Sequence, residues 1–195
     1  MTAARHVKIL IGLTGSIASG KSTALACFEE LGAAVLSADE IVRKLYQRPV
    51  VCRQLTRLFG TAAPAQLARH VFQDKTARKQ LEALLHPLVW KEMQAKIKSI
   101  KEPCVVLELP LLFEAGWENR VDLTVLISGG KNSQRARLQA RGLTKAEHQR
   151  RLQAQLPESE KIKRADICLV NDKTPRELKG KIDRLYRALK QIYHF

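Results

Sequence analysis

Short apolar runs alternate with amphipathic stretches along the chain, and this alternation predicts the fold class. Five runs have the length of strands buried on both faces: Val7–Leu13, Ala33–Leu36, Cys104–Leu109, Leu123–Ile127 and Ile167–Val170. Helical spacing extends over Ser22–Leu31 and Pro175–Tyr193, and basic helices are expected over residues 131–141 and 144–156. Strands alternating with helices favour an α/β fold, a three-layer arrangement with a central parallel five-stranded sheet.

A long helical region interrupts this alternation. Residues 40–100 are mostly helical in pattern, which is too much chain for one crossover between neighbouring strands. We therefore expect one domain, residues 1–195, that carries a helical lobe over approximately residues 45–100. The pair His86-Pro87 indicates a junction between helices within it. Ser37 and Glu40 have the spacing of a capping box at the start of the region.

The apolar runs are too short for a membrane protein. None approaches the 18 or so residues of a membrane-spanning helix. The first run breaks at Thr14-Gly15 without a cleavage site, so we interpret it as a strand and not a signal peptide, and we expect a cytoplasmic protein. The four cysteines include no C-x-x-C pair, which argues against a zinc or redox motif.

The charge is strongly basic and unevenly distributed. The chain carries a formal net charge of +15, and residues 131–195 contribute +10 of it, with 17 Lys/Arg against 7 Asp/Glu. Concentration in one segment favours an element that faces phosphate groups, while many of these side chains form a solvated surface. A nucleic-acid surface remains an alternative.

One motif carries specific chemistry. Residues Gly15–Ser22 read G-S-I-A-S-G-K-S and match the phosphate-binding pattern G-x-x-x-x-G-K-[ST] between a predicted strand and a predicted helix. Glycine permits backbone angles and close approaches that a Cβ would block. Successive N–H groups and the helix N-terminus then form a cradle for anionic oxygens. Lys21 is expected to reach the β and γ phosphates of a nucleotide, and the Ser22 hydroxyl to ligate Mg²⁺.

The loop alone leaves several classes of protein open. A GTPase would be expected to show an N-K-x-D motif, and the chain has none. A small-molecule kinase, a nucleoside monophosphate kinase and a nucleic-acid-binding ATPase all remain compatible with the loop.

Further segments narrow the choice, because in combination they resemble the dephospho-CoA kinase family. These are GLTGSIASGKST (12–23), FEELGAAVLSADEIVR (28–43), LEALLHPLV (81–89), VVLELPLLFEAG (105–116) and RLQAQLPESEKIKRADICLVND (151–172). They occur in the family's order and extend almost from end to end. The resemblance implies ATP- and Mg²⁺-dependent phosphorylation of the ribose 3′-hydroxyl of dephospho-CoA, the last step of coenzyme A synthesis. It implies neither a nucleic-acid partner nor a membrane, and it leaves the oligomeric state open.

The residues and the resemblance together predict roles for particular positions. Asp39 is the expected catalytic base, and Arg43 and His86 are expected on the substrate. The nucleotide would contact Asn171 and the loop residues Gly15, Ala18, Ser19, Gly20, Lys21, Ser22 and Thr23. Glu108 ends a buried strand, where it is expected near the Mg²⁺ shell. Residues 131–165 would form a basic lid, with Arg141 as its catalytic arginine and Arg137 and Arg151 as further candidates.

The chain departs from the family pattern at several positions. Ser16 and Ala18 replace glycines of the usual loop, and we expect a small effect because neither is a required glycine of the general motif. Ser37 replaces the first aspartate of a D-A-D sequence, whereas Asp39 retains the second. Residues 47–72 and the stretch around Arg141 look shortened relative to the family. Of the roles that the resemblance implies, the contacts to the substrate are therefore the least certain to apply to this chain.

Overall fold

The computed structural model describes residues 8–130 and 155–195 and divides the chain into two compact units. The first, which we call the sheet unit, comprises the chain up to Leu36 and from Ile100 to Phe195. The second, the helical unit, is Ser37–Ser99. Within the described ranges, no helix is both long enough and apolar enough to cross a membrane.

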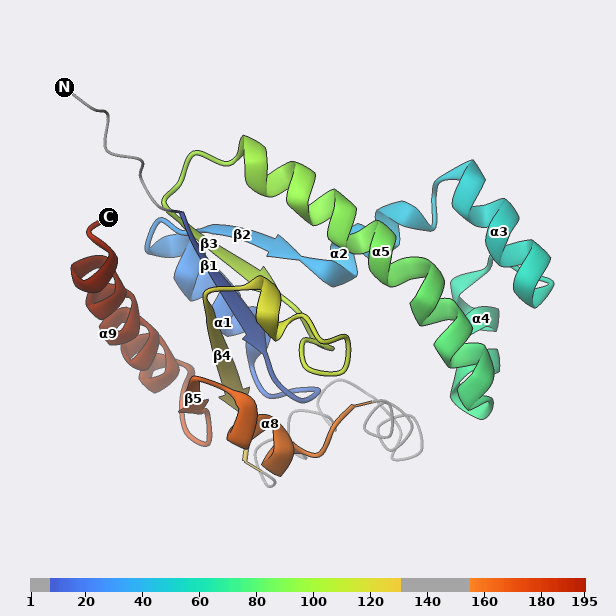
Figure 1. The fold of residues 1–195 in the computed structure, drawn as a ribbon. Coiled ribbons are helices and arrows are strands. Elements are labelled where there is room, and N and C mark those ends of the chain that lie inside the picture. Colours follow the sequence, from blue (N-terminus) through green and yellow to red (C-terminus); the bar gives the residue numbers. More distant parts are fainter. Residues whose placement is uncertain (1–7, 131–154) are drawn as a thin grey trace. The chain divides into compact units, whose positions relative to one another are not determined.

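The sheet unit is built on a five-stranded sheet, as the sequence predicts (Figure 1). Its strands are β1 (Ile9–Thr14), β2 (Ala34–Ser37), β3 (Cys104–Glu108), β4 (Leu123–Ser128) and β5 (Ile167–Val170), in the order β2-β3-β1-β4-β5. β1 pairs in parallel with β3 and β4, and β4 with β5. The predicted fold class is therefore confirmed, and β1 occupies the centre of the sheet.

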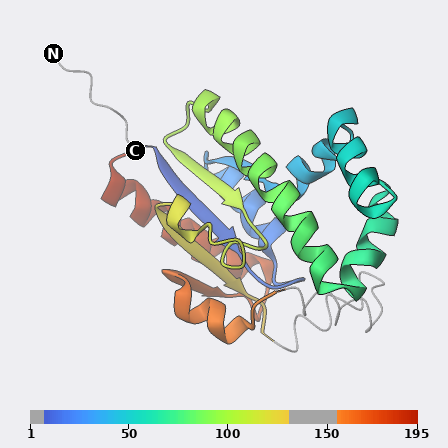
Figure 2. The same cartoon turned by 45° about the vertical axis from the view of Figure 1, so that its right-hand side comes forward.

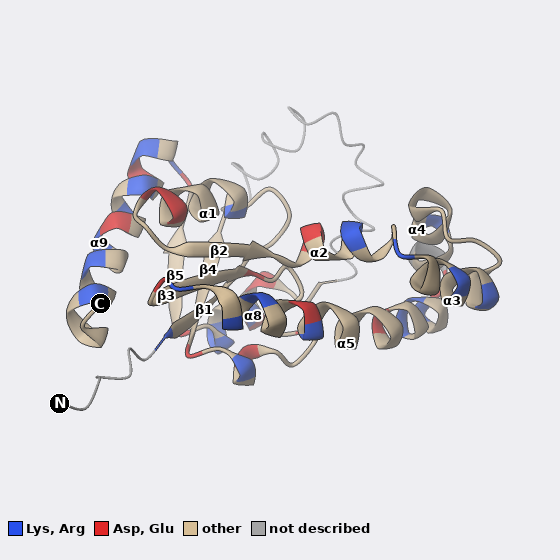
Figure 3. Cartoon of the chain, turned by 90° about the horizontal axis from the view of Figure 1, so that it is seen from above, with Lys and Arg blue, Asp and Glu red and all other residues tan. Residues whose placement is uncertain are grey.

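Helices cover both faces of this sheet. Those of the sheet unit are α1 (Lys21–Glu30), the 3₁₀ turn η1 (Glu118–Arg120), α8 (Glu158–Arg164) and α9 (Pro175–Tyr193). α1 and α8 lie on opposite sides of the sheet (Figure 3). The helix expected over residues 131–141, and most of that expected over 144–156, lie outside the described residues.

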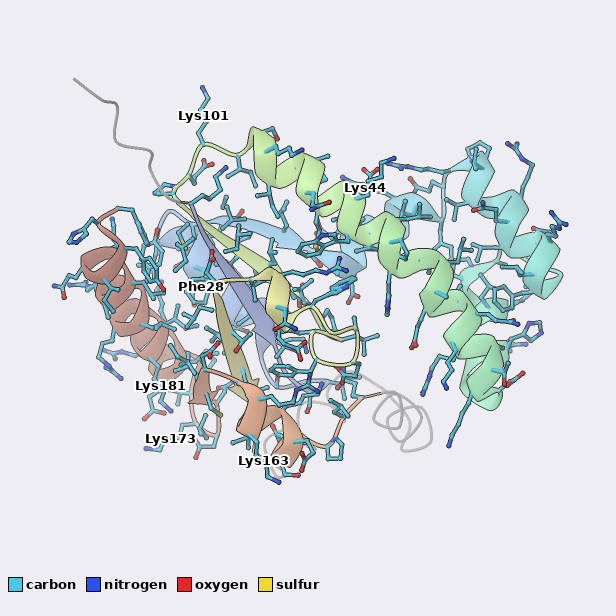
Figure 4. The ribbon with its side chains drawn as sticks, in the orientation of Figure 1. Phe28, Lys44, Lys101, Lys163, Lys173 and Lys181 are labelled. Carbon is cyan, nitrogen blue, oxygen red and sulfur yellow. The ribbon has the colours of Figure 1, made fainter. Side chains whose placement is uncertain are left out.

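The core lies between the sheet and the helices α1 and α9. Alternate residues of β1, namely Ile9, Ile11 and Leu13, are buried in it, as the two-residue period of a strand requires. Phe28 of α1, labelled in Figure 4, is fully buried. Its ring meets that of Tyr186 of α9 edge-on, with centroids 6.3 Å apart. Burying an aromatic or aliphatic side chain of this size contributes about 2 kcal/mol, so this layer fixes β1 and α1 together.

The helical unit contains α2 (Ala38–Leu45), α3 (Pro49–Phe59), α4 (Pro64–Gln73) and α5 (Lys75–Ser99), and Figure 2 shows the long α5 from a second side. α3 and α4 both begin with proline, whose missing N–H is not needed at a helix start. Leu55, Leu67 and Met93 are fully buried. The sequence placed the start of the lobe near residue 45, whereas this unit begins at Ser37 and includes α2.

Two local expectations in this region were wrong. α5 continues through Pro87, so there is no helical junction at His86-Pro87. Pro87 is exposed, and water can satisfy the carbonyl that its missing N–H leaves free. Ser37 is the N-cap of α2, but its side chain makes no capping bond, and Glu40 lies 3.8 Å from Arg43.

A buried ion pair joins two sequence motifs across the sheet unit. Lys161 of α8 is 0% exposed, and its Nζ lies 3.0 Å from Oε1 of Glu114, in the turn after β3. The same Oε1 accepts a hydrogen bond from the backbone N–H of Leu156 at 2.7 Å. We call these contacts of Glu114 with Leu156 and Lys161 the clasp. It connects the segment P-L-L-F-E to the segment Q-x-P-x-x-x-K.

Neighbouring contacts reinforce the clasp. Arg164 donates to the carbonyl of Phe113 at 3.3 Å and lies over its ring at 4.9 Å. Asp166 accepts hydrogen bonds from the hydroxyl and the N–H of Thr124 at 2.6 and 2.8 Å, and these bonds lower the pKa of its carboxyl group. The end of α8 is thus fixed to the turn after β3, and the residues that follow it are fixed to β4.

Replacing Lys161 with alanine should lower the free energy of unfolding by about 3–5 kcal/mol, because the Glu114 carboxylate would lose its buried counter-charge. Urea denaturation measures the change. The double variant Lys161→Met/Glu114→Gln should be closer to the wild type. Lys163→Ala, which removes an exposed partner of Glu160, is the matched control and should cost less than about 1 kcal/mol. A Lys161→Ala protein as stable as this control would contradict the role of the clasp.

Candidate active site

The phosphate-binding motif lies at the centre of one edge of the sheet. Its loop begins directly after β1 and leads into α1, whose N-cap is Gly20. Ligands of open α/β sheets bind at the carboxyl ends of the strands, and the N-terminus of α1 points its free N–H groups into the loop. The fold therefore places the motif where the chemistry requires it.

Glycine is needed at both ends of the loop. A Cβ on Gly15 would lie 2.5 Å from the carbonyl oxygen of Ile127 in β4 and 2.6 Å from the Ser19 hydroxyl. Gly20 has φ 105°, and a Cβ there would collide with the side-chain amide of Asn171. The loop is thus fitted against the ends of β4 and β5, and both positions exclude any side chain.

Ala18 adopts the left-handed conformation with φ 59°, which an L-residue occupies at a cost of about 1–2 kcal/mol. This is one of the two positions where the family pattern has glycine. Ser16, the other, is not among the residues with positive φ. The predicted small effect of these replacements on activity stays a prediction, but the loop holds Ala18 in an unfavourable backbone geometry.

Lys21 folds back over the loop that precedes it. Its Nζ donates to the carbonyl oxygens of Gly15 at 2.8 Å and Ser16 at 3.0 Å. The ammonium group is thereby held against the loop that is expected to bind phosphate oxygens. Ser22 and Thr23 follow in the first turn of α1, and both are exposed.

Glu108 stands next to the loop strand. It is the last residue of β3 and lies opposite Leu13 of β1, two residues before Gly15. It is partly buried. A hydroxyl on Ser22 and a carboxylate on Glu108 are hard oxygen ligands, the kind that Mg²⁺ prefers, and a magnesium ion on a nucleotide needs only one or two protein ligands. Among the described residues there is no cluster of three or more acidic, His or Cys side chains that would form a dedicated metal site.

Asn171 supports the loop from the end of β5. It is 5% exposed, its Nδ2 donates to the Ser19 carbonyl at 2.8 Å, and its backbone N–H donates to Ser128 at 2.6 Å. Contact with adenine stays a prediction. The sequence showed only that Asn171 follows a strand, and no local pattern reveals that its amide would reach the phosphate loop.

The three predicted substrate residues Asp39, Arg43 and His86 all belong to the helical unit. Asp39 is exposed in the first turn of α2 and forms no hydrogen bond or ion pair with any described residue. The side chain of Arg43 is 73% exposed and lies 3.8 Å from Glu40. His86 is partly buried in α5, and this burial lowers its pKa, although Glu82 partly offsets the effect. The candidates for the lid, Arg137, Arg141 and Arg151, lie outside the described residues.

Known proteins resemble this chain over nearly its whole length. A family model described as dephospho-CoA kinase matches residues 9–177. A dephospho-CoA kinase of Symbiobacterium thermophilum is 39% identical over 193 residues, covering 92% of this chain and 80% of its own. One of Thermus thermophilus is 38% identical and covers 97% and 92%. A crystal structure of a Thermus thermophilus protein matches with a TM-score of 0.82 at 36% identity, covering 93% of this chain and 98% of that one.

Replacing Asn171 with alanine should raise the KM for ATP roughly tenfold, because the Ser19 carbonyl loses a buried hydrogen bond worth about 1–3 kcal/mol and the loop loses its geometry. Steady-state kinetics with ATP and with GTP separate the two roles of this residue. Support of the loop predicts that both KM values rise by the same factor, whereas an adenine contact predicts a rise for ATP alone. Asn119→Ala, at an exposed asparagine of η1, is the control and should change neither.

Proposed function

Because the chain belongs to the dephospho-CoA kinase family, we propose that it transfers the γ-phosphoryl group of ATP to the ribose 3′-hydroxyl of dephospho-CoA, giving coenzyme A and ADP. The observation that carries this function is the family match over residues 9–177, which includes the phosphate loop. Neither a nucleoside monophosphate kinase nor a nucleic-acid-binding ATPase is favoured by these matches. A cytoplasmic location without a nucleic-acid partner fits this reaction.

The loop is proposed to hold the phosphates of ATP. Its N–H groups and the N-terminus of α1 would bind the phosphate oxygens, and Lys21 would exchange its bonds to Gly15 and Ser16 for bonds to the β and γ phosphates. Phosphoryl transfer has little covalent chemistry for a protein to perform, so a rigid, correctly charged cradle is the main contribution.

Ser22 and Glu108 are the residues proposed to hold Mg²⁺. When bound, the ion neutralises charge on the β and γ phosphates. The register of Glu108 opposite Leu13 supports this assignment, because it sets the carboxylate beside the strand that leads into the loop.

Asp39 is proposed to orient the attacking hydroxyl and accept its proton. A carboxylate in this role must be accessible and not committed to another partner, and Asp39 meets both conditions. Arg43 and His86 are proposed to contact the substrate. A neutral His86, favoured by its lowered pKa, could donate or accept a hydrogen bond without adding charge.

The proposed lid is narrower than the sequence indicated. Residues 155–165 include Leu156 and Lys161 of the clasp, and a buried Lys161 is not free to reach a nucleotide. We therefore confine the lid to residues 131–154, with Arg141 as the arginine that stabilises the transferring phosphoryl group.

Lys21→Ala should abolish kinase activity while the protein stays folded, because the variant lacks the cation for the β and γ phosphates. An ADP-release assay with dephospho-CoA, AMP, CMP and RNA measures both activity and substrate choice. ADP release from the wild type should depend on dephospho-CoA, and circular dichroism checks the fold of the variant. Normal turnover by a folded Lys21→Ala protein, or stimulation of the wild type by RNA alone, would refute the proposed function.

Asp39→Asn should lower kcat by roughly 10²-fold or more with little change in the KM for ATP, since the amide cannot accept the proton. Lys44→Gln removes another exposed charge from the same helix, at a residue with no proposed role, and is the control. Single-turnover measurements isolate the chemical step. If both variants stay within about threefold of the wild type, Asp39 is only a residue at the start of α2.

A further inference from the structure

A strongly basic pocket lies on the outer face of α9, in the sheet unit. Its volume is about 360 Å³, and it is lined by Lys173, Arg176, Glu177, Gly180, Lys181 and Arg184. Figure 3 shows the Lys and Arg positions along this helix, and Figure 4 shows Lys173 and Lys181 near its first turns. None of these residues belongs to the phosphate loop, and the kinase function assigns no role to them.

The single acid of the pocket is already engaged elsewhere. Glu177 completes the capping box of α9: its backbone N–H donates to the Thr174 hydroxyl, and its Oε2 accepts from the Thr174 N–H at 3.2 Å. Its other oxygen lies 3.6 Å from Lys173. The capping box also bonds a free backbone N–H group at the start of α9. The positive charge of the pocket therefore comes from its side chains and not from the helix end.

The arginines of the pocket are available for a ligand. Lys181 donates to the Val170 carbonyl at 2.5 Å, which fixes its ammonium group at the edge of β5. Neither Arg176 nor Arg184 forms a hydrogen bond or an ion pair within the described part of the chain. They lie eight residues apart on α9, two helical turns, with Gly180 between them.

Gly180 is the unusual residue of this face. Glycine inside a helix costs about 1 kcal/mol relative to alanine. No backbone strain requires it, and a Cβ there would meet only Nη1 of Arg184, at 3.9 Å. The missing side chain leaves the helix surface bare between the two arginines, both of which line the pocket.

We propose that this pocket is a binding site for a compact oligophosphate, separate from the ATP site. The pocket has four cationic side chains and one carboxylate, which is already bonded to the helix cap, so its charge suits a multivalent anion. Each arginine can bind phosphate oxygens through two parallel hydrogen bonds. The lining contains no aromatic side chain on which a nucleobase could stack. Its volume lies at the lower end of ligand sites, which fits a chain of two or three phosphates, either free or carried by a nucleotide.

Titration of the full-length protein with inorganic triphosphate, followed by the backbone NMR shifts of residues 173–184, tests the site separately from the loop. We expect saturable binding, with a Kd that rises at least about tenfold in Arg176→Ala/Arg184→Ala. The matched control is Arg187→Ala, which removes a charge from the same helix outside the pocket, where Arg187 pairs with Asp183 at 3.0 Å. It should change the Kd less than about twofold.

Two further arms define the ligand. ATP and inorganic triphosphate should give the same Kd at these resonances if the phosphates alone are bound, and a tighter Kd for ATP identifies a nucleotide as the source. Shifts that do not saturate, or a Kd that rises as much in Arg187→Ala as in the double variant, would overturn the proposal. Either result would mean that the anion responds to the overall positive charge of the helix and not to a defined site. A short RNA that shifts Lys179 and Lys190 as strongly as the pocket, with steep salt dependence, would overturn it in favour of a nucleic-acid surface.

Discussion

The close approach of the phosphate loop to the ends of β4 and β5 is the constraint on which the site depends. Gly15 leaves no room for a side chain beside the carbonyl of Ile127, and Gly20 leaves none beside Asn171. Such contacts require that the strands end at the correct level, and this level is set by parallel pairing and by the core beneath β1. The geometry proposed to bind phosphate is thus a property of the whole sheet and not of eight residues alone.

Much of this architecture can be predicted from the sequence, for identifiable reasons. Buried strands give continuous apolar runs, and β5 and α9 have the bounds that the pattern predicts. The loop motif is informative because glycine, lysine and serine are each required there by a separate physical demand. The family resemblance adds the reaction, which no local pattern contains.

The failures of prediction concern which of several possible contacts form. Ser37 and Glu40 have the spacing of a capping box, yet Glu40 pairs with Arg43, whereas Thr174 and Glu177 form such a box. Spacing shows which bonds are possible, and competition among partners decides which of them form. The burial of Lys161 is likewise invisible locally, because lysine is rarely buried and its partner Glu114 lies 47 residues away.

The clasp also bears on how such chains change during evolution. It anchors residues 155–161 beside the turn after β3. The chain between the end of β4 and the clasp is therefore held at both of its ends. The entropy of closing an interval between fixed ends depends only weakly on its length, about 0.6 kcal/mol per doubling. The entropy of closure therefore sets little constraint on the length of that interval, and its two fixed ends keep the sheet and the phosphate loop in place.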